Sequence, residues 1–189
     1  MAASDEAELV RMINTSTEIN DRPCAFRYPR GTGLGSILPS INDKIEIGKS
    51  KIIKEGKKLA ILNFGARLNE TLKAAENLLK KGVPITVVDA RFAKPLDENL
   101  IWQLATTHEA IMTIEEGSIG GFGSHVVNFL TKKGLMDSNL KFRSLTLPDI
   151  FIDQDTPDKM YKVANLDSVS IEEKVLDLLN SNIVLKKQN

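Results

Sequence analysis

The stretch LAILNFGARLNETLKAAENLLKKGVPITVVDA, residues 59–90, decides which fold we predict for this chain. LAILNF (59–64) is an apolar run of strand length, and residues 69–81 carry apolar positions at helical spacing until Gly82 ends them. PITVVDA (84–90) is a second apolar run. Strands that are apolar on both faces and are joined by a helix are typical of a parallel sheet covered by helices.

The same alternation of strands and helices continues to the end of the chain. The sequence predicts further strands at 110–116 and 141–147, and further helices at 97–106, 121–133, 158–164 and 170–182. We therefore expect residues 58–189 to form an α/β domain, a three-layer sandwich with a mainly parallel sheet.

The first 57 residues have a different pattern. Residues 4–20 predict an amphipathic helix capped by Ser4 or Asp5, and CAFRY (24–28) predicts a short strand that ends at Pro29. The following glycine-rich stretch predicts a connection, with a short hairpin over 44–53. We therefore separate residues 1–35 from a linker at 36–57.

Composition limits the classes of function. The 189 residues include 25 Lys and Arg and 25 Asp and Glu, so the net charge of zero argues against a nucleic-acid partner. No apolar run reaches the roughly 18 residues that a membrane span needs. The single Cys24 cannot form an internal disulfide, and we expect it to be a buried structural thiol in a cytoplasmic protein.

EEGSIGGFGSH (115–125) is the first candidate site, because it follows a predicted strand and opens a predicted helix. Glycines at such a place can present backbone amides to a phosphate. The spacing lacks the third glycine of a dinucleotide fingerprint, and Glu115 and Glu116 would repel an anion. Close packing or a subunit contact is the alternative, and we favour it.

RYPRG (27–31) is the second candidate site. An arginine fork suits a phosphate, and residues three apart in an extended chain point to opposite faces. One of Arg27 and Arg30 can therefore face a cleft, but the residues alone favour the alternative, a pair of solvated or ion-paired arginines, and the spacing does not decide between them.

The two histidines do not predict catalysis or a metal site. His108 and His125 lie on separate segments without cysteine or carboxylate at ligand spacing. We expect His108 at the surface after a helix and His125 near a helix start, and we assign no catalytic, cofactor-binding or metal-binding residue.

Four strings, in order along the chain, resemble 1-deoxy-D-xylulose-5-phosphate synthases, a transketolase-like family of thiamine-diphosphate enzymes. Residues 4–35 are similar to the end of that family's pyrimidine-binding domain. Residues 85–101, 113–126 and 147–161 are similar to signatures of its carboxy-terminal domain. The strings VDARFAKPLD and TIEEG also occur in related enzymes, whereas RYPRG and LPDIFIDQDTPDKMY are more specific to the synthases.

The resemblance implies a parent enzyme that joins pyruvate to glyceraldehyde 3-phosphate with loss of carbon dioxide. Its product is a precursor of isoprenoids, thiamine and pyridoxal. Such an enzyme is a homodimer that holds thiamine diphosphate through magnesium. The family's GDG motif and its activating glutamate are absent here, so we expect the chain alone to bind no cofactor and to be inactive, serving as scaffold and dimer contact. The resemblance places Arg30 on the arginine that binds the acceptor phosphate.

Two alternatives remain open. The chain can be the carboxy-terminal part of a 2-oxoacid dehydrogenase beta subunit, which docks a partner enzyme. It can also be an independent α/β module that binds an anion in its glycine loop.

Overall fold

The structure is a computed structural model that describes residues 1–180. Its elements run in the order α1 (Glu6–Ser16), β1 (Lys51–Lys54), β2 (Leu59–Phe64), α2 (Leu68–Lys80), β3 (Thr86–Asp89), α3 (Glu98–Thr107), β4 (Ala110–Glu115), α4 (Phe122–Lys132), η1 (Leu135–Asp137), β5 (Lys141–Leu145), α5 (Pro157–Val163) and α6 (Ser168–Asn180).

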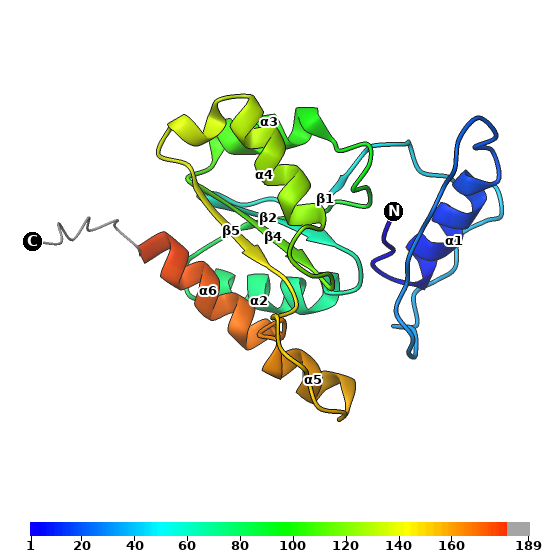
Figure 1. Ribbon diagram of the computed structural model, residues 1–189. Helices are drawn as coiled ribbons and strands as arrows, with labels where there is room; N and C mark the ends of the chain where they lie inside the picture. The colour runs from blue at the N-terminus through cyan, green and yellow to red at the C-terminus, as the bar shows by residue number, and fades with distance from the viewer. Residues whose placement is uncertain (181–189) are drawn as a thin grey trace, which may run out of the picture.

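Five strands form one sheet in the order β1-β3-β2-β4-β5. Strands β3, β2, β4 and β5 are parallel, and β1 is antiparallel to β3 at one edge. Helices α3 and α4 cover one face, and α2 and α6 cover the other (Figure 1). The predicted three-layer α/β sandwich with a mainly parallel sheet is therefore confirmed.

Both faces of the central strands are buried, as the apolar runs predicted. All six residues of β2 and all six of β4 are buried. Leu59 and Ile61 pack in the core under α2 and α6, whereas Ala60 and Leu62 pack in the core under α3 and α4. Alternation along the strand thus fills two cores at once.

The predicted helices and strands from residue 58 onward lie within two residues of their observed bounds. The helix predicted for 170–182 begins at Ser168, and residues 181 and 182 lie outside the described part of the chain. The helix predicted for 4–20 is shorter, because the hydroxyls of Thr15, Ser16 and Thr17 donate to carbonyls of the preceding turn where it ends.

Three predictions for the first 57 residues are wrong. CAFRY forms no strand, since only Arg27 pairs, in a single bridge to Ala2. Cys24 is consequently exposed and not buried. The predicted hairpin over 44–53 does not form either, because Lys51–Lys54 pairs with β3, and the predicted linker 36–57 therefore contributes a strand to the sheet. The division into 1–35, 36–57 and 58–189 stays a prediction.

The amino-terminal segment docks at the carboxyl end of β3 through buried polar side chains. Asp5 caps α1 as predicted, accepting from the amide of Glu8 at 2.7 Å. Ser4 instead donates its hydroxyl to Asp89 at 2.6 Å, and Arg91 pairs with Glu8 at 2.8 Å. Burial is the main reason that the pKa of Asp89 is raised to about 6, and the nearby Glu8 adds to the rise.

The protonation of Asp89 predicts a pH-dependent stability. The pKa of Asp89 rises from 3.8 in the unfolded chain to about 6 in the folded chain. Protonation of Asp89 therefore stabilises the fold fully below about pH 4, and this stabilisation is lost as the pH rises through 6. A difference of about two units corresponds to roughly 3 kcal/mol. Urea unfolding from pH 4 to 7 should show the wild-type chain losing about that much relative to Asp89→Asn. The exposed Asp177→Asn is the control, and a constant difference between wild type and Asp89→Asn would contradict the prediction.

Candidate functional site

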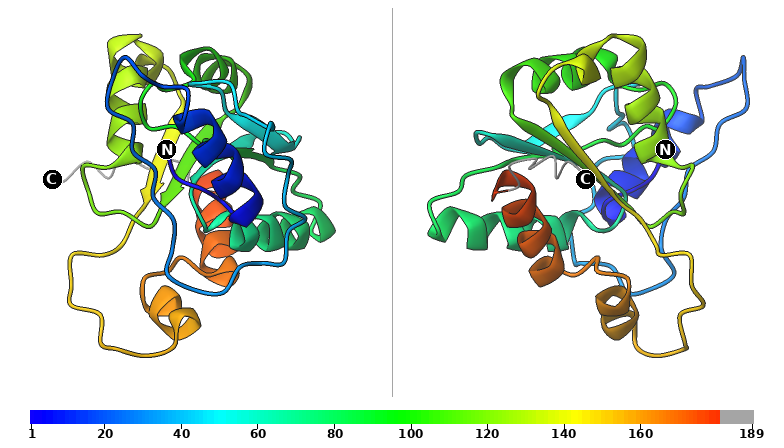
Figure 2. Two further views of the ribbon diagram at one scale, coloured as in Figure 1. Left: turned by 90° about the vertical axis from the view of Figure 1, so that its right-hand side faces the viewer. Right: turned by 60° about the vertical axis from the view of Figure 1, so that its left-hand side comes forward.

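The candidate site lies where β2, β3 and β4 end together. The left view of Figure 2 faces this edge and shows α1 in front of the strand ends. The backbone amide of Ala2 donates to the carbonyl of Arg91 at 3.0 Å, and the amide of Ala3 donates to that of Arg27 at 3.1 Å. These bonds bring RYPRG against the carboxyl edge of the sheet, where open α/β sheets bind ligands.

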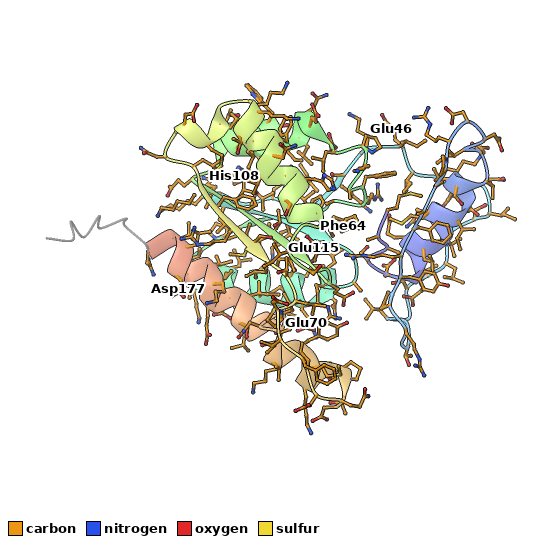
Figure 3. All side chains as sticks on the ribbon, viewed as in Figure 1. Glu46, Phe64, Glu70, His108, Glu115 and Asp177 are labelled. Atoms are coloured by element: carbon orange, nitrogen blue, oxygen red, sulfur yellow. The ribbon has the colours of Figure 1, made fainter. Side chains whose placement is uncertain are left out.

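Arg27 packs against this edge of the sheet, although its side chain stays 45% exposed. Its guanidinium lies over the ring of Phe64 at 5.0 Å and lies 3.9 Å from the buried carboxylate of Glu115. Phe64 in turn stacks on Phe122 at 4.8 Å. Figure 3 shows Phe64 and Glu115 next to each other at the strand ends. Arg27 therefore faces the sheet and is paired.

The glycine loop at 117–123 surrounds the carboxylate of Glu115. The amide of Gly123 donates to this carboxylate at 2.9 Å. A Cβ at Gly117 would lie 2.6 Å from a carboxylate oxygen, and one at Gly121 would lie 2.8 Å from the carboxylate carbon. The loop needs glycine because the chain's own anion fills it, which supports packing over phosphate binding.

Arg67 is held by a second acidic residue. Its guanidinium pairs with Glu116 at 2.9 Å and lies 3.5 Å from the centre of the Tyr161 ring. Burial, followed by the Glu116 carboxylate, raises the pKa of Tyr161 to about 12. The loop after β2, the end of β4 and α5 are joined by this cluster.

Arg30 lines a pocket of about 390 Å³ beside this cluster, together with Glu6, Tyr28, Arg67 and Tyr161. The volume lies in the range of small-molecule sites. Arg30 is exposed and makes no ion pair with any of residues 1–180. Of the two arginines in RYPRG, Arg27 is thus ion-paired, whereas the guanidinium of Arg30 has no ion-pair partner among residues 1–180.

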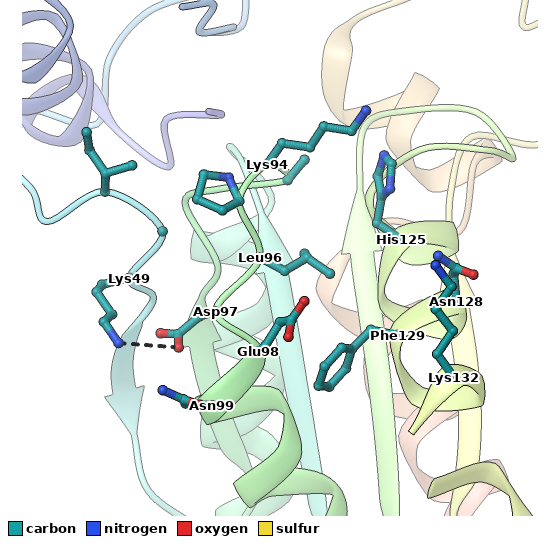
Figure 4. A pocket seen from close by; sticks show the side chains of 14 residues that line it. Lys49, Lys94, Leu96, Asp97, Glu98, Asn99, His125, Asn128, Phe129 and Lys132 are labelled. Atoms are coloured by element: carbon teal, nitrogen blue, oxygen red, sulfur yellow. Dashed lines mark ion pairs between the residues drawn. The ribbon is translucent and has the colours of Figure 1, made fainter. Parts of the chain in front are cut away.

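A second hollow, of about 570 Å³, lies between the start of α3 and the side of α4 (Figure 4). His125 lines it near the start of α4, as predicted, with Lys94, Lys132 and Glu98. The mixed charges give the hollow no clear preference for an anion or a cation.

His108 follows α3, as predicted, but it is half-buried there and not fully at the surface. Its Nε2 lies 2.8 Å from the hydroxyl of Thr86, and burial lowers the pKa of the imidazole. Among residues 1–180, no group of three His, Cys, Asp or Glu side chains is arranged to hold a metal ion. No helix in that range is long and apolar enough to cross a membrane.

Sequence reasoning missed the partners of the arginines. Glu115 and Glu116 were interpreted as residues that repel an anion, whereas they bind Arg27 and Arg67. Adjacent glutamates at the end of a buried strand, with arginines elsewhere, were the available signal. The pairing joins residues far apart in sequence, so spacing could not reveal it.

The fold and this edge define the chain as an α/β domain with a mainly parallel sheet, whose carboxyl edge is covered by an amino-terminal segment. Residues 48–171 match the family described as "Transketolase, C-terminal domain". The chain therefore belongs to the transketolase C-terminal domain family.

The solved structures that are similar to the chain include two transketolases. One is described as "Split gene transketolase, inactive beta4 tetramer", with a TM-score of 0.79 and 26% identity over 94% of this chain and 56% of that chain. The other is transketolase from Campylobacter jejuni subsp. jejuni NCTC 11168, with a TM-score of 0.51 and 13% identity over 69% of this chain and 18% of that chain. The chain thus spans about half the length of the first and under a fifth of the second.

Gly121→Ala should be destabilising, because the added methyl group would displace the carboxylate of Glu115. Overpacking of this kind costs about 1–3 kcal/mol. Gly31→Ala is the matched control, since a Cβ there meets nothing within 4 Å, and it should change stability by less than about 0.5 kcal/mol. Urea unfolding measures both variants, and equal stabilities would contradict the packing role of the loop.

Proposed function

We propose that the chain is the carboxy-terminal part of a 1-deoxy-D-xylulose-5-phosphate synthase. The parent enzyme would condense pyruvate with glyceraldehyde 3-phosphate and release carbon dioxide, in the synthesis of isoprenoid precursors and of thiamine. The observation that carries the proposal is the unpaired Arg30 of RYPRG, which lines a pocket at the carboxyl edge of the sheet.

Charge supports Arg30 as the residue that binds the acceptor phosphate. Arg27 and Arg67 have their own carboxylates, and Arg11 and Arg91 both pair with Glu8. The guanidinium of Arg30 remains available. An arginine fork can donate two parallel hydrogen bonds to a phosphate.

The residues of this chain do not fit thiamine diphosphate or magnesium. Its glycine loop at 117–123 is filled by Glu115, so it offers no cradle for a diphosphate. The loop at 33–36 is likewise occupied, because its amides donate to Glu6. We propose that the rest of the parent enzyme holds both groups and supplies the carbanion chemistry, and that this chain contributes scaffold, dimer contact and Arg30.

The parent would be a homodimer located in the cytoplasm, as its family resemblance and the lone thiol of Cys24 suggest. A second candidate is one half of a split transketolase, because the chain is 26% identical to such a protein over 94% of its length. Product analysis separates the two, since only the synthase consumes pyruvate. The independent anion-binding module is less well supported, because internal carboxylates occupy both glycine-rich loops.

The chain alone should not bind thiamine diphosphate, because carboxylates occupy both glycine-rich loops of residues 1–180. Calorimetric titration with the cofactor and magnesium at millimolar concentration should give no saturable heat. Saturable binding in the micromolar range would contradict the proposal and favour a self-contained module.

Arg30→Ala in the parent enzyme should reduce kcat/KM for glyceraldehyde 3-phosphate by about 30- to 1000-fold. The reason is the loss of a charge-assisted contact of roughly 2–4 kcal/mol, at about tenfold per 1.4 kcal/mol. Use of pyruvate should change little. Arg30→Lys should recover only part of the loss, because a point charge replaces a fork.

Arg27→Ala is the control for this experiment. Since Arg27 pairs with Glu115 and covers Phe64, its removal should lower stability more than it affects the acceptor. Steady-state kinetics with each substrate varied separately test the assignment. A selective acceptor defect in Arg27→Ala, but not in Arg30→Ala, would show that the residue assignment is wrong.

A further inference from the structure

Glu6 holds the glycine-rich loop that follows Arg30. Its carboxylate accepts hydrogen bonds from three successive backbone amides, those of Leu34 at 3.0 Å, Gly35 at 2.6 Å and Ser36 at 2.8 Å. The loop wraps closely around the carboxylate, because a Cβ at Gly33 would lie 2.7 Å from one of its oxygens. Three successive amides directed at one anion form a backbone nest.

A second bond fastens the same loop to the start of α1. The hydroxyl of Ser36 donates to Asp5 at 3.0 Å, and the other oxygen of Asp5 caps the helix through the amide of Glu8. The loop is therefore anchored to the first turn of α1 by two carboxylates.

The loop 31–36, which Glu6 and Asp5 anchor, has little conformational preference of its own. Gly31, Gly33 and Gly35 follow Arg30 within five residues, and Gly35 has a φ of +82°. Glycine has more backbone freedom to lose on folding than any other residue. Arg30 and Glu6 line the same pocket, so the anchored loop sets where the Arg30 backbone lies.

We propose that Glu6 is a positioning residue, which fixes the loop 31–36 so that the guanidinium of Arg30 points into the pocket. The proposal rests on the proposed function, in which Arg30 binds the acceptor phosphate. Glu6 forms no ion pair with Arg30, because its carboxylate accepts hydrogen bonds from the amides of the loop. Its own amide and those of Leu34, Gly35 and Ser36 hold the pKa of Glu6 below its usual value.

Limited trypsin digestion of this chain tests the anchor without any activity. The Arg30–Gly31 bond is an exposed trypsin site, and its cleavage requires the loop to open locally so that the chain can extend into the protease. Glu6→Ala should be cleaved there about tenfold faster than wild type. Glu6→Gln should be intermediate, because it keeps one oxygen acceptor and loses the charge.

Glu18→Ala is the control, since Glu18 is an exposed glutamate just after α1 and pairs with Lys44 outside the loop. Its cleavage rate at Arg30–Gly31 should equal that of wild type. An unchanged rate in Glu6→Ala, or an equal increase in Glu18→Ala, would overturn the proposal.

Kinetics of the parent enzyme test the effect on Arg30. Glu6→Ala should raise KM for glyceraldehyde 3-phosphate about tenfold, with kcat and the KM for pyruvate unchanged, and Glu6→Gln should recover part of the loss. If Glu6 has only a structural role, Glu6→Ala should lower kcat with both substrates together. That result would overturn the positioning role.

The same assays separate this proposal from the proposed function. If Arg30→Ala raises the acceptor KM but Glu6→Ala does not, the positioning role is wrong and the function stands. If Glu6→Ala opens the loop but Arg30→Ala leaves the acceptor KM unchanged, the proposed function is wrong and so is the role that we assign to Glu6 in it.

Discussion

The carboxylate of Glu115 is the group on which the arrangement of the candidate site depends. It is 2% exposed at the end of β4, and a buried carboxylate is stable only when donors or cations surround it. The amide of Gly123 and the guanidinium of Arg27 supply these partners, one from the start of α4 and the other from the amino-terminal segment. A single charge therefore joins the sheet, a covering helix and the segment that carries RYPRG.

The layers of the fold could be predicted because they follow from local patterns. LAILNF has no polar face apart from Asn63, so it can only be a strand buried on both sides, and Gly82 marks the end of α2. Strand β1 could not be predicted in the same way. KIIK has four residues with two exposed isoleucines, and it is a strand only because β3 offers an edge to it. Strand formation depends on a partner that is distant in sequence.

CAFRY was predicted to be a strand and is not one, again because strand formation depends on a partner that the local sequence does not show. Its composition favours a strand, but among residues 1–180 its only bridge partner is Ala2, and one bridge does not make a strand. In the candidate site, Arg30 could be proposed only from the family resemblance, whereas the ion pairs of Arg27 and Arg67 required three-dimensional contacts. Glycine spacing likewise favoured close packing of the loop at 117–123, but it could not show that the occupant was Glu115. At 31–35 it indicated only a connection, and the contact with Glu6 was not predicted.

The two glycine-rich loops illustrate one physical rule with opposite consequences for function. Each loop wraps closely around a carboxylate, with three amides donating to Glu6 and that of Gly123 donating to Glu115, and neither has room for a second anion. Around Glu115 the anion also pairs with Arg27, so that arginine becomes part of the structure. The carboxylate of Glu6 accepts hydrogen bonds from amides of the loop. Arg30, next to this loop, has no carboxylate partner among residues 1–180. A ligand with a phosphate group would find at this edge of residues 1–180 one arginine that no carboxylate has neutralised, and electrostatics rather than loop geometry therefore selects the binding residue.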